Sequence, residues 1–291
     1  MSASTFTPTI IAEPWAISVL AWMRRNPTIV IGSAVLLFFV AIALFAPWIA
    51  GDPLAFEPLN RLKRPSAEYW FGTDQLGRDV FSRVVYGTRI SLIVGVSVAA
   101  VATLLGMMIG MLCGYYRRVD DIVMRIMDGM MAIPAILLAI ALITLMKADL
   151  VIVIVAISIP EIPRVVRLVR SVVLTVRGLP YIEAAVSSGT RSLQIMSRHI
   201  LPSIVAPLIV QATYVCSAAV LTEAGLSFLG AGTPPEIPSW GNVIAGGRAF
   251  FQLAPWIIFF PGLMLALAVL AINLVGDGLR DSLDPRIARR L

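Results

Sequence analysis

The sequence predicts an all-α polytopic membrane protein with six transmembrane helices, and three observations lead to this fold class. The chain has 291 residues, of which 58% are hydrophobic and 14% are charged, which suits a lipid bilayer better than a single water-soluble core. Long runs contain no charged residue, and each is close to or above the roughly 20 residues that cross hydrocarbon as a helix. Arginines collect in alternate connecting segments, as expected when one face of the membrane is cytoplasmic.

Five of the spans are defined by uncharged runs. The first run is too long for the core of a signal peptide, so we interpret it as a retained anchor. The sixth span starts near Leu150, and its uncharged run ends at Pro160, so this helix must carry Glu161 and Arg164 towards the interface to complete a crossing. The five uncharged runs are 26–51, 90–116, 129–146, 200–222 and 249–276.

The distribution of positive charge favours the sixth span. With it, the N-terminus, the loop near residue 120, the loop holding Glu183 and the C-terminal tail all share one face, which we predict to be cytoplasmic. Both termini of this multi-pass protein of the cytoplasmic (inner) membrane are then inside. That face holds 15 of the 23 basic residues. They are Arg24, Arg25, Arg117, Arg118, Arg125, Arg164, Arg167, Arg170, Arg177, Arg191, Arg198, Arg280, Arg286, Arg289 and Arg290.

Three segments organise the chain. Residues 1–88 hold a cytoplasmic tail, the first transmembrane helix and an extracytoplasmic segment. Residues 89–280 hold the other five spans and a polar loop at about 178–202, and residues 281–291 form a cytoplasmic tail. In the extracytoplasmic segment, Asp74 stands four residues before Arg78 and Asp79 four before Arg83, spacings that allow both pairs to form on one helix.

Several function classes are excluded or disfavoured. The net charge of +6 requires no nucleic acid, because the basic residues lie where anionic lipid can meet them. Both lysines, Lys63 and Lys147, lie outside any GxxxxGK[ST] phosphate loop, and HExxH and GxSxG motifs are absent. The sole histidine, His199, excludes a multi-histidine metal site. An ion-coupled carrier is disfavoured because the spans contain almost no ionisable residue.

The twenty residues from Glu183 to Pro202, EAAVSSGTRSLQIMSRHILP, predict a docking element between two apolar stretches. Pro180 is placed to start a short helix, Gly189 to end it in a left-handed cap, and Ser192 to cap a second short helix that runs to His199. The alternative is an amphipathic hairpin that lies on the lipid surface.

This loop resembles the EAA loop of ABC importer permeases, whose two short helices couple transport to ATP hydrolysis. His199 or Ile200 occupies the place of a common apolar residue of the pattern. The matching positions are Glu183, Ala184, Ala185, Gly189, Leu201 and Pro202.

Three longer strings resemble the C-type permease subunits of oligopeptide and dipeptide ABC importers, within the binding-protein-dependent transport system permeases. With the loop, the resemblance covers almost the whole chain after residue 25. The strings are FGTDQLGRDVFSRVVYGTRISL, LTEAGLSFLGAGTPPEIPSWGNVIAGGR and FPGLMLALAVLAINLVGDGLRDSLDPR.

The resemblance implies a type I importer permease that is not itself an enzyme and moves oligopeptides inward. Its expected partners are a homologous second permease, two ATPase subunits or domains, an extracytoplasmic peptide-binding protein and the bilayer. ATP and Mg would be bound by the ATPase, with no cofactor in this chain. Dipeptides, nickel chelates, glutathione and other small solutes remain alternative cargoes.

Other residues carry weaker predictions. Met127, Met130 and Met131 suit a pathway for varied peptides, although ordinary helix packing would also explain them. Glu223 and Trp240 are candidates for the outer mouth, with capping and turn roles equally open. We also predict that Asp128 pairs with Arg125. Arg164, Arg167 and Arg170 are expected to contact either lipid headgroups or the ATPase.

Overall fold

The computed structural model describes residue 24, residues 26–146 and residues 149–283, and these form helices joined by loops. The C-terminal tail predicted at 281–291 therefore lies mostly outside the described residues. The helices, in chain order, are α2 Pro27–Ile49, α3 Val80–Tyr115, α4 Arg117–Met131, α5 Ala135–Leu145, α6 Leu150–Arg177, α7 Pro180–Ser187, α8 Ser192–Ile195, α9 Leu201–Phe228, α10 Trp240–Gly247 and α11 Trp256–Leu283. The short elements are the 3-10 helices Pro58–Asn60 and Arg248–Phe250 and a π turn over Met196–Ile200.

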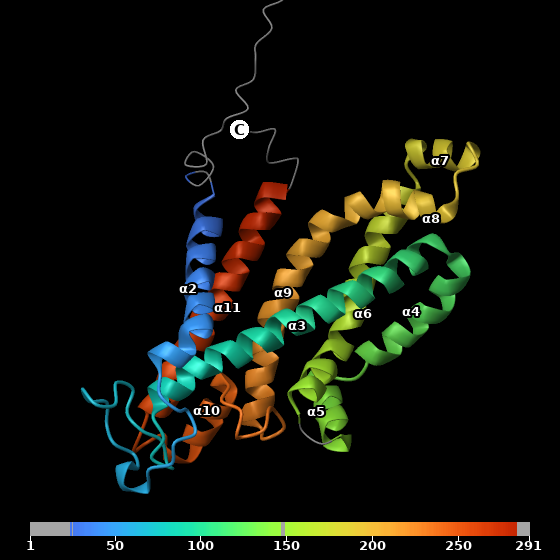
Figure 1. Cartoon of the computed structure of the whole chain (residues 1–291). Coiled ribbons are helices and arrows are strands. Elements are labelled where there is room, and N and C mark those ends of the chain that lie inside the picture. The colour runs from blue at the N-terminus through green and yellow to red at the C-terminus, as the bar shows by residue number, and fades with distance from the viewer. Residues whose placement is uncertain (1–23, 25, 147–148, 284–291) are drawn as a thin grey trace, which may run out of the picture.

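The chain runs back and forth between two ends of the molecule (Figure 1). The start of α2, the end of α11 and the pair α7 and α8 lie at one end, whereas α5, α10 and the segment before α3 lie at the other. Of the described helices, α2, α3, α11 and the continuous helix Ser192–Phe228 are long and apolar enough to cross a membrane, and α4 with α5 adds a fifth candidate if that bent pair is one span. The span predicted from Leu150 forms a continuous helix, α6, but its charged residues keep it out of this set.

The second long helix starts ten residues before the predicted span. Asp79 is its N-cap and accepts hydrogen bonds from the backbone N–H groups of Phe81 and Ser82 at 3.3 and 2.9 Å, which satisfies donors that the first turn leaves free. The boundary predicted at residue 88 therefore lies inside α3. Asp79 does not pair with Arg83; instead Arg83 contacts Asp74.

The third predicted span is broken. α4 and α5 meet at 89° across the break that ends at Pro134. The residue before a proline disfavours helical backbone, so the helix ends before Ile133 and restarts after the proline. The uncharged run 129–146 concealed this break, because it joins the last turn of α4 to all of α5.

The contact between α3 and α6 is unusually close. Gly106, Gly110 and Gly114 stand every four residues along one side of α3. A Cβ added to them would lie 2.5, 2.7 and 2.5 Å from the Cβ atoms of Val165, Val169 and Val173 in turn. Small residues at this spacing allow two helix backbones to approach each other. The larger buried core cluster is built around this contact and includes residues of α5, α7, α8 and α9.

A second buried cluster joins α2, α3, α10 and α11 near the other end. Trp240, which starts α10, lies at its centre and is fully buried. Its ring packs edge-on against Phe39 of α2 at 5.6 Å, and its Nε1–H donates to the carbonyl of Val84 in α3 at 3.2 Å. One aromatic side chain thus ties three helices together.

Candidate functional site

The loop between α6 and α9 has the local structure that its sequence predicts. Pro180 stands in the first turn of α7, where its missing N–H costs nothing. Gly189 has φ +77°, a left-handed conformation that favours glycine. The backbone N–H groups of Gly189 and Thr190 donate to the carbonyls of Val186 and Ala185 at 3.0 and 3.1 Å. The predicted left-handed cap at Gly189 is confirmed.

The second half of the loop differs from the prediction. Ser192 is the first residue of α8 rather than its cap, because Arg191 holds the N-cap position. α8 does not stop at His199; it passes through the π turn Met196–Ile200 directly into α9 at Leu201. Pro202 follows the π turn, as the second residue of α9. The second short helix is therefore the first part of a helix that extends to Phe228.

The loop is attached to the bundle through buried apolar side chains. Ile182 of α7, Ile195 of α8, and Met196 and Ile200 of the π turn are all buried, and belong to the same core cluster as Val176 near the end of α6. Burying each such side chain contributes about 1.5–3 kcal/mol. The loop is therefore a fixed extension of the helical bundle.

The opposite surface of the loop is open and partly apolar. Glu183, Ala184 and Gly189 are exposed, and Ala185 is half-buried. A Cβ on Gly189 would meet no atom within 4 Å. Nearby, Val186 is 55% exposed and Leu193 73% exposed. These two apolar side chains face outwards, whereas Ile182 and Ile195 of the same two short helices are buried.

His199 and Tyr181 lie beside each other at the base of the loop. The ring centroids are 6.4 Å apart, and His199 is half-buried while Tyr181 is exposed. His199, in the π turn, therefore packs against α7. Within the described residues, no group of three or more possible metal ligands exists.

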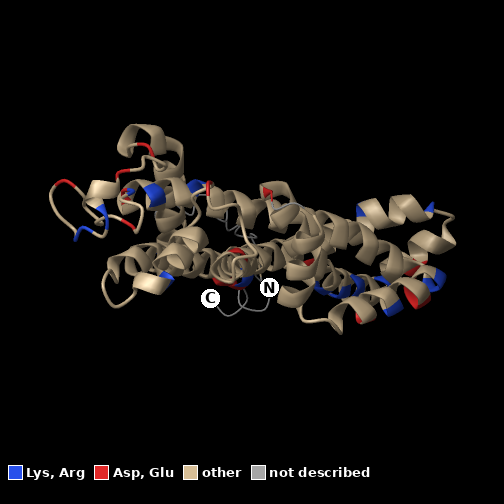
Figure 2. Ribbon diagram, turned by 90° about the horizontal axis from the view of Figure 1, so that it is seen from below, with Lys and Arg blue, Asp and Glu red and all other residues tan. Residues whose placement is uncertain are grey.

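Salt bridges hold α4 against the half of α6 that leads to the loop. Arg170 pairs with Asp120 through two hydrogen bonds, one of them 2.6 Å long from Nη2. Arg167 pairs with Asp128 at 2.5 Å. The prediction that Asp128 pairs with Arg125 is therefore wrong. Figure 2 shows basic and acidic residues gathered at the side of the molecule where Figure 1 places α4.

The arginines of α6 are thus engaged within the chain. Arg164 donates to Glu161 at 2.8 Å, and Arg177 donates to the carbonyl of Tyr115 at 2.8 Å while lying over its ring. Because Arg164, Arg167 and Arg170 all have intramolecular partners, neither the lipid nor the ATPase contact predicted for them is needed to explain their positions.

The methionines predicted for a pathway lie in different environments. Met127 is buried, Met130 is half-buried and Met131 is 39% exposed. Met127 therefore packs inside the chain, in line with the alternative of ordinary helix packing, and only Met131 presents a substantial surface to a partner or a solute.

Glu223 and Trp240, predicted for the outer mouth, both have fully buried side chains. One carboxylate oxygen of Glu223 accepts hydrogen bonds from the hydroxyls of Ser227 and Ser239 at 2.8 Å each and of Thr233 at 3.3 Å. The other oxygen is buried with no donor among the described residues. These two side chains do not line the mouth. Glu223 joins α9 to the following loop and to the start of α10, and Trp240 joins α10 to α2 and α3.

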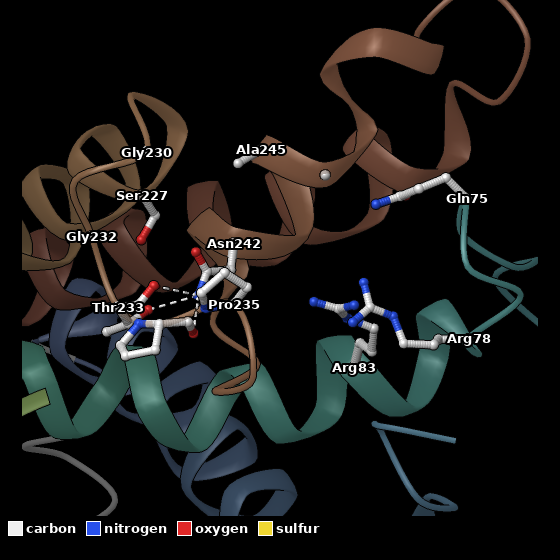
Figure 3. A pocket seen from close by; sticks show the side chains of 12 residues that line it. Gln75, Arg78, Arg83, Ser227, Gly230, Gly232, Thr233, Pro235, Asn242 and Ala245 are labelled. Carbon is white, nitrogen blue, oxygen red and sulfur yellow. Dashed lines mark hydrogen bonds between the residues drawn. The ribbon is translucent and has the colours of Figure 1, made fainter. Parts of the chain in front are cut away.

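Sequence reasoning missed a cavity in this region. It is enclosed by the segment before α3, the loop after α9 and α10, and has a volume of about 290 Å³ (Figure 3). Arg78 and Arg83 lie on one side, and Ser227, Thr233 and Asn242 on the other. The four-residue spacing of acidic residues and arginines in this region is the sequence feature that could have indicated the cavity. The same spacing is also typical of ion pairs along one helix, so it did not point to a cavity.

Known proteins match this chain over most of its length. Residues 102–289 match the family described as binding-protein-dependent transport system inner membrane component. Residues 15–65 match the N-terminal transmembrane domain of oligopeptide transport permease C.

Individual relatives are similar across nearly the full chain. A protein of Sinorhizobium fredii named as a probable peptide ABC transporter permease is 56% identical over 92% of each chain. A dipeptide transport system permease of Alkalihalophilus pseudofirmus is 43% identical over 94% of this chain and 91% of its own. A glutathione transport system permease of Pectobacterium atrosepticum is 41% identical over 95% of this chain and 93% of its own.

Proposed function

The chain belongs to the family of binding-protein-dependent transport system inner membrane components, and from this we propose that it is the permease subunit of an ATP-driven importer of peptides. It is an all-helical integral protein of the inner membrane with the type I permease fold. In the proposal, the chain forms part of the passage, and partner subunits bind and hydrolyse ATP.

The loop from α7 to the π turn carries the proposal of coupling. Its inner side is buried in the bundle through Ile182 and Ile195, while Glu183, Val186 and Leu193 face outwards. Exposed apolar side chains on a firmly anchored element are typical of a surface that a partner protein covers. We propose that the ATPase covers this surface and that its movement displaces the loop together with α9.

The remaining parts of the assembly follow from the family. The proposed complex contains a homologous second permease, two ATPase subunits or domains that hold ATP and Mg, and an extracytoplasmic binding protein. The loop and both termini are placed on the cytoplasmic side. Alternating access requires two packings of the bundle that ATP binding favours to different extents.

Peptides are the proposed cargo, with oligopeptides first. The relatives are named for peptide, dipeptide and glutathione transport, which are all molecules built on peptide bonds. Dipeptides are the second candidate, and nickel chelates or other small solutes come after them. An ion-coupled carrier is the rival mechanism, and the near absence of charge within the long apolar helices disfavours it.

Uptake by the reconstituted complex tests the function. Vesicles that contain this chain, its permease partner, the ATPase and the binding protein should accumulate a labelled oligopeptide only with ATP, and vanadate should block this uptake. Uptake that follows a proton gradient without ATP would instead identify a carrier.

Gly189→Val tests the coupling loop. Both Gly189 and Gly129 have open space where a Cβ would be, but only Gly189 has a positive φ. A β-branched residue strongly disfavours that conformation, so Gly189→Val should distort the cap, reduce copurification of the ATPase and abolish uptake while the protein stays in the membrane.

Gly129→Val is the matched control and should retain ATPase binding. Glu183→Ala should also reduce uptake, since Glu183 is exposed and its loss leaves the core intact. Full uptake by the Gly189 and Glu183 variants would refute the proposed coupling surface.

A further inference from the structure

The cavity of about 290 Å³ lies at the end of the molecule opposite α7 and α8. Three separate parts of the chain form its walls: the turn that precedes α3, the loop that follows α9, and α10. Figure 3 shows the side chains of Gln75, Arg78 and Arg83 on one side and those of Thr233 and Asn242 on the other. Its size is near the lower limit of roughly 300–1,000 Å³ for small-molecule sites.

The wall formed by the turn before α3 is positively charged. Arg78 Nε and Arg83 Nη1 both donate to the same oxygen of Asp74, at 2.7 and 3.0 Å. The other oxygen of Asp74 accepts from the backbone N–H groups of Leu76 and Arg78, at 2.8 and 3.0 Å. One carboxylate thus serves two guanidinium groups, which leaves a net positive charge on this side.

One buried N–H donor of Arg83 has no acceptor among the described residues. The residue is only 3% exposed, and its Nε is buried with no hydrogen-bond acceptor among the described residues. A buried donor without an acceptor is costly, and a charged one more so. Gln75, on the same side of the cavity, also has a buried amide oxygen without a partner. The oxygen of Gln75 is an acceptor and would pair with an N–H group, so of the two only the guanidinium group of Arg83 suits an anion.

The opposite wall is neutral and fixed in place. The amide nitrogen of Asn242 donates to the carbonyls of Thr233, Pro234 and Ile237 at 3.0 Å each, which holds the loop in position. Among the described residues that line the cavity, none is acidic. Glu223 lies behind this wall, where the hydroxyls of Ser227 and Thr233 donate to it.

We propose that this cavity binds the carboxylate group of a small peptide through the guanidinium groups of Arg78 and Arg83, which line it. The proposal rests on the proposed function and adds a feature of the cargo that the permease itself recognises. Two planar guanidinium groups suit a carboxylate because they offer paired N–H donors. A cavity of this size accepts the end of a peptide and excludes a folded domain.

Comparison of two cargoes in the reconstituted complex tests this proposal. The measurement is the uptake of one tripeptide with a free C-terminal carboxylate divided by the uptake of the same tripeptide as its carboxamide. Arg78→Gln should lower this ratio by about ten- to hundredfold, the loss expected for a hydrogen bond to a charged group. Because every complex has the same binding protein, the preference of that protein cancels when variants are compared.

Arg64→Gln is the matched control. Arg64 is exposed in the same segment and does not line the cavity, so its replacement removes an equal charge and should leave the ratio unchanged. If Arg78→Gln does not assemble, Ala245→Glu provides a second test, because Ala245 lines the cavity and the new carboxylate would occupy it. Ala245→Glu should lower the ratio further than Ala245→Gln does.

The outcomes separate this inference from the proposed function. A wild-type complex that imports neither tripeptide would overturn peptide import itself. Import of both tripeptides with an unchanged ratio in Arg78→Gln and Ala245→Glu would overturn the carboxylate site alone. An equal fall for both tripeptides, with weaker attachment of the binding protein, would also overturn it and would assign the arginines to an acidic side chain of that protein.

Discussion

The contact between Gly110 of α3 and Val169 of α6 has no room for a side chain, so Gly110→Ala must push the two helices apart. The new Cβ would lie 2.7 Å from the Cβ of Val169 and 2.9 Å from the carbonyl oxygen of Val166. Carbon atoms in ordinary contact are about 3.5–4.0 Å apart, so the helices must separate locally by about 1 Å.

Two opposing effects set the size of the change. Overpacking of a well-packed interior costs about 1–3 kcal/mol, whereas Ala is favoured over Gly within a helix by about 1 kcal/mol. Gly110→Ala should therefore lower the free energy of unfolding by about 0–2 kcal/mol. Gly262→Ala in α11 is the control, because no atom lies within 4 Å of its added Cβ, and it should stabilise by up to about 1 kcal/mol.

Denaturation of the purified chain in detergent micelles gives the free energy of unfolding of each variant and of the wild type. The difference between them isolates the overpacking cost of about 1–3 kcal/mol. The cost of Gly110→Ala should also shrink in a Val169→Gly background, where the opposing Cβ is absent. Equal shifts for Gly110→Ala and Gly262→Ala would refute the close packing of α3 on α6.

Two further predictions concern contacts between distant parts of the chain. Asp120→Ala and Arg170→Ala should show a coupling of about 1 kcal/mol in a double-mutant cycle of unfolding, because the two side chains share two hydrogen bonds; strictly additive losses would contradict the pairing. Trp240→Phe should cost about 0.5–1.5 kcal/mol for the lost hydrogen bond to the carbonyl of Val84, which keeps the hydroxyl of Thr88 as a donor. Trp256→Phe removes the hydrogen bond from Nε1–H to the carbonyl of Thr73, a fully buried residue. Thermal unfolding should show a loss of about 1–3 kcal/mol from this bond, and no measurable loss would contradict it.

Features that depend on neighbouring residues could be predicted from the sequence. The start of α7 at Pro180 and the left-handed cap at Gly189 follow from backbone restrictions of those two residues. The apolar runs located α2 within two residues and overlap most of α9 and α11, because the need to satisfy backbone hydrogen bonds in lipid permits little besides helix. The family resemblance of the extended strings likewise depends only on the order of the residues.

Features that depend on distant residues could not be predicted. Asp128 pairs with Arg167 rather than with Arg125, which stands three residues away on its own helix. Gly106, Gly110 and Gly114 carry the GxxxG spacing, but only the fold reveals that valines of α6 face them. The bend before Pro134 was not predicted because hydropathy measures how apolar a run is and does not distinguish a straight helix from a bent one.

The burial of Glu223 was missed for a related reason. The sequence places it at the end of an apolar run, where an exposed position is the simpler expectation. The hydroxyl donors that allow its burial come from positions four, ten and sixteen residues later, on a loop whose path depends on Asn242.

Because α8 continues into α9, one helix joins the proposed coupling loop to the other end of the molecule. Ser192–Phe228 spans 37 residues, which at 1.5 Å per residue gives an axis of about 55 Å, longer than the roughly 40–45 Å thickness of a bilayer with its headgroups. Ser227, near its far end, lines the cavity on the side opposite Arg83. Pro202 and Pro207 donate no backbone N–H within this helix, but the helix has no break, so a displacement of one end can reach the other side of the membrane without a separate linking segment.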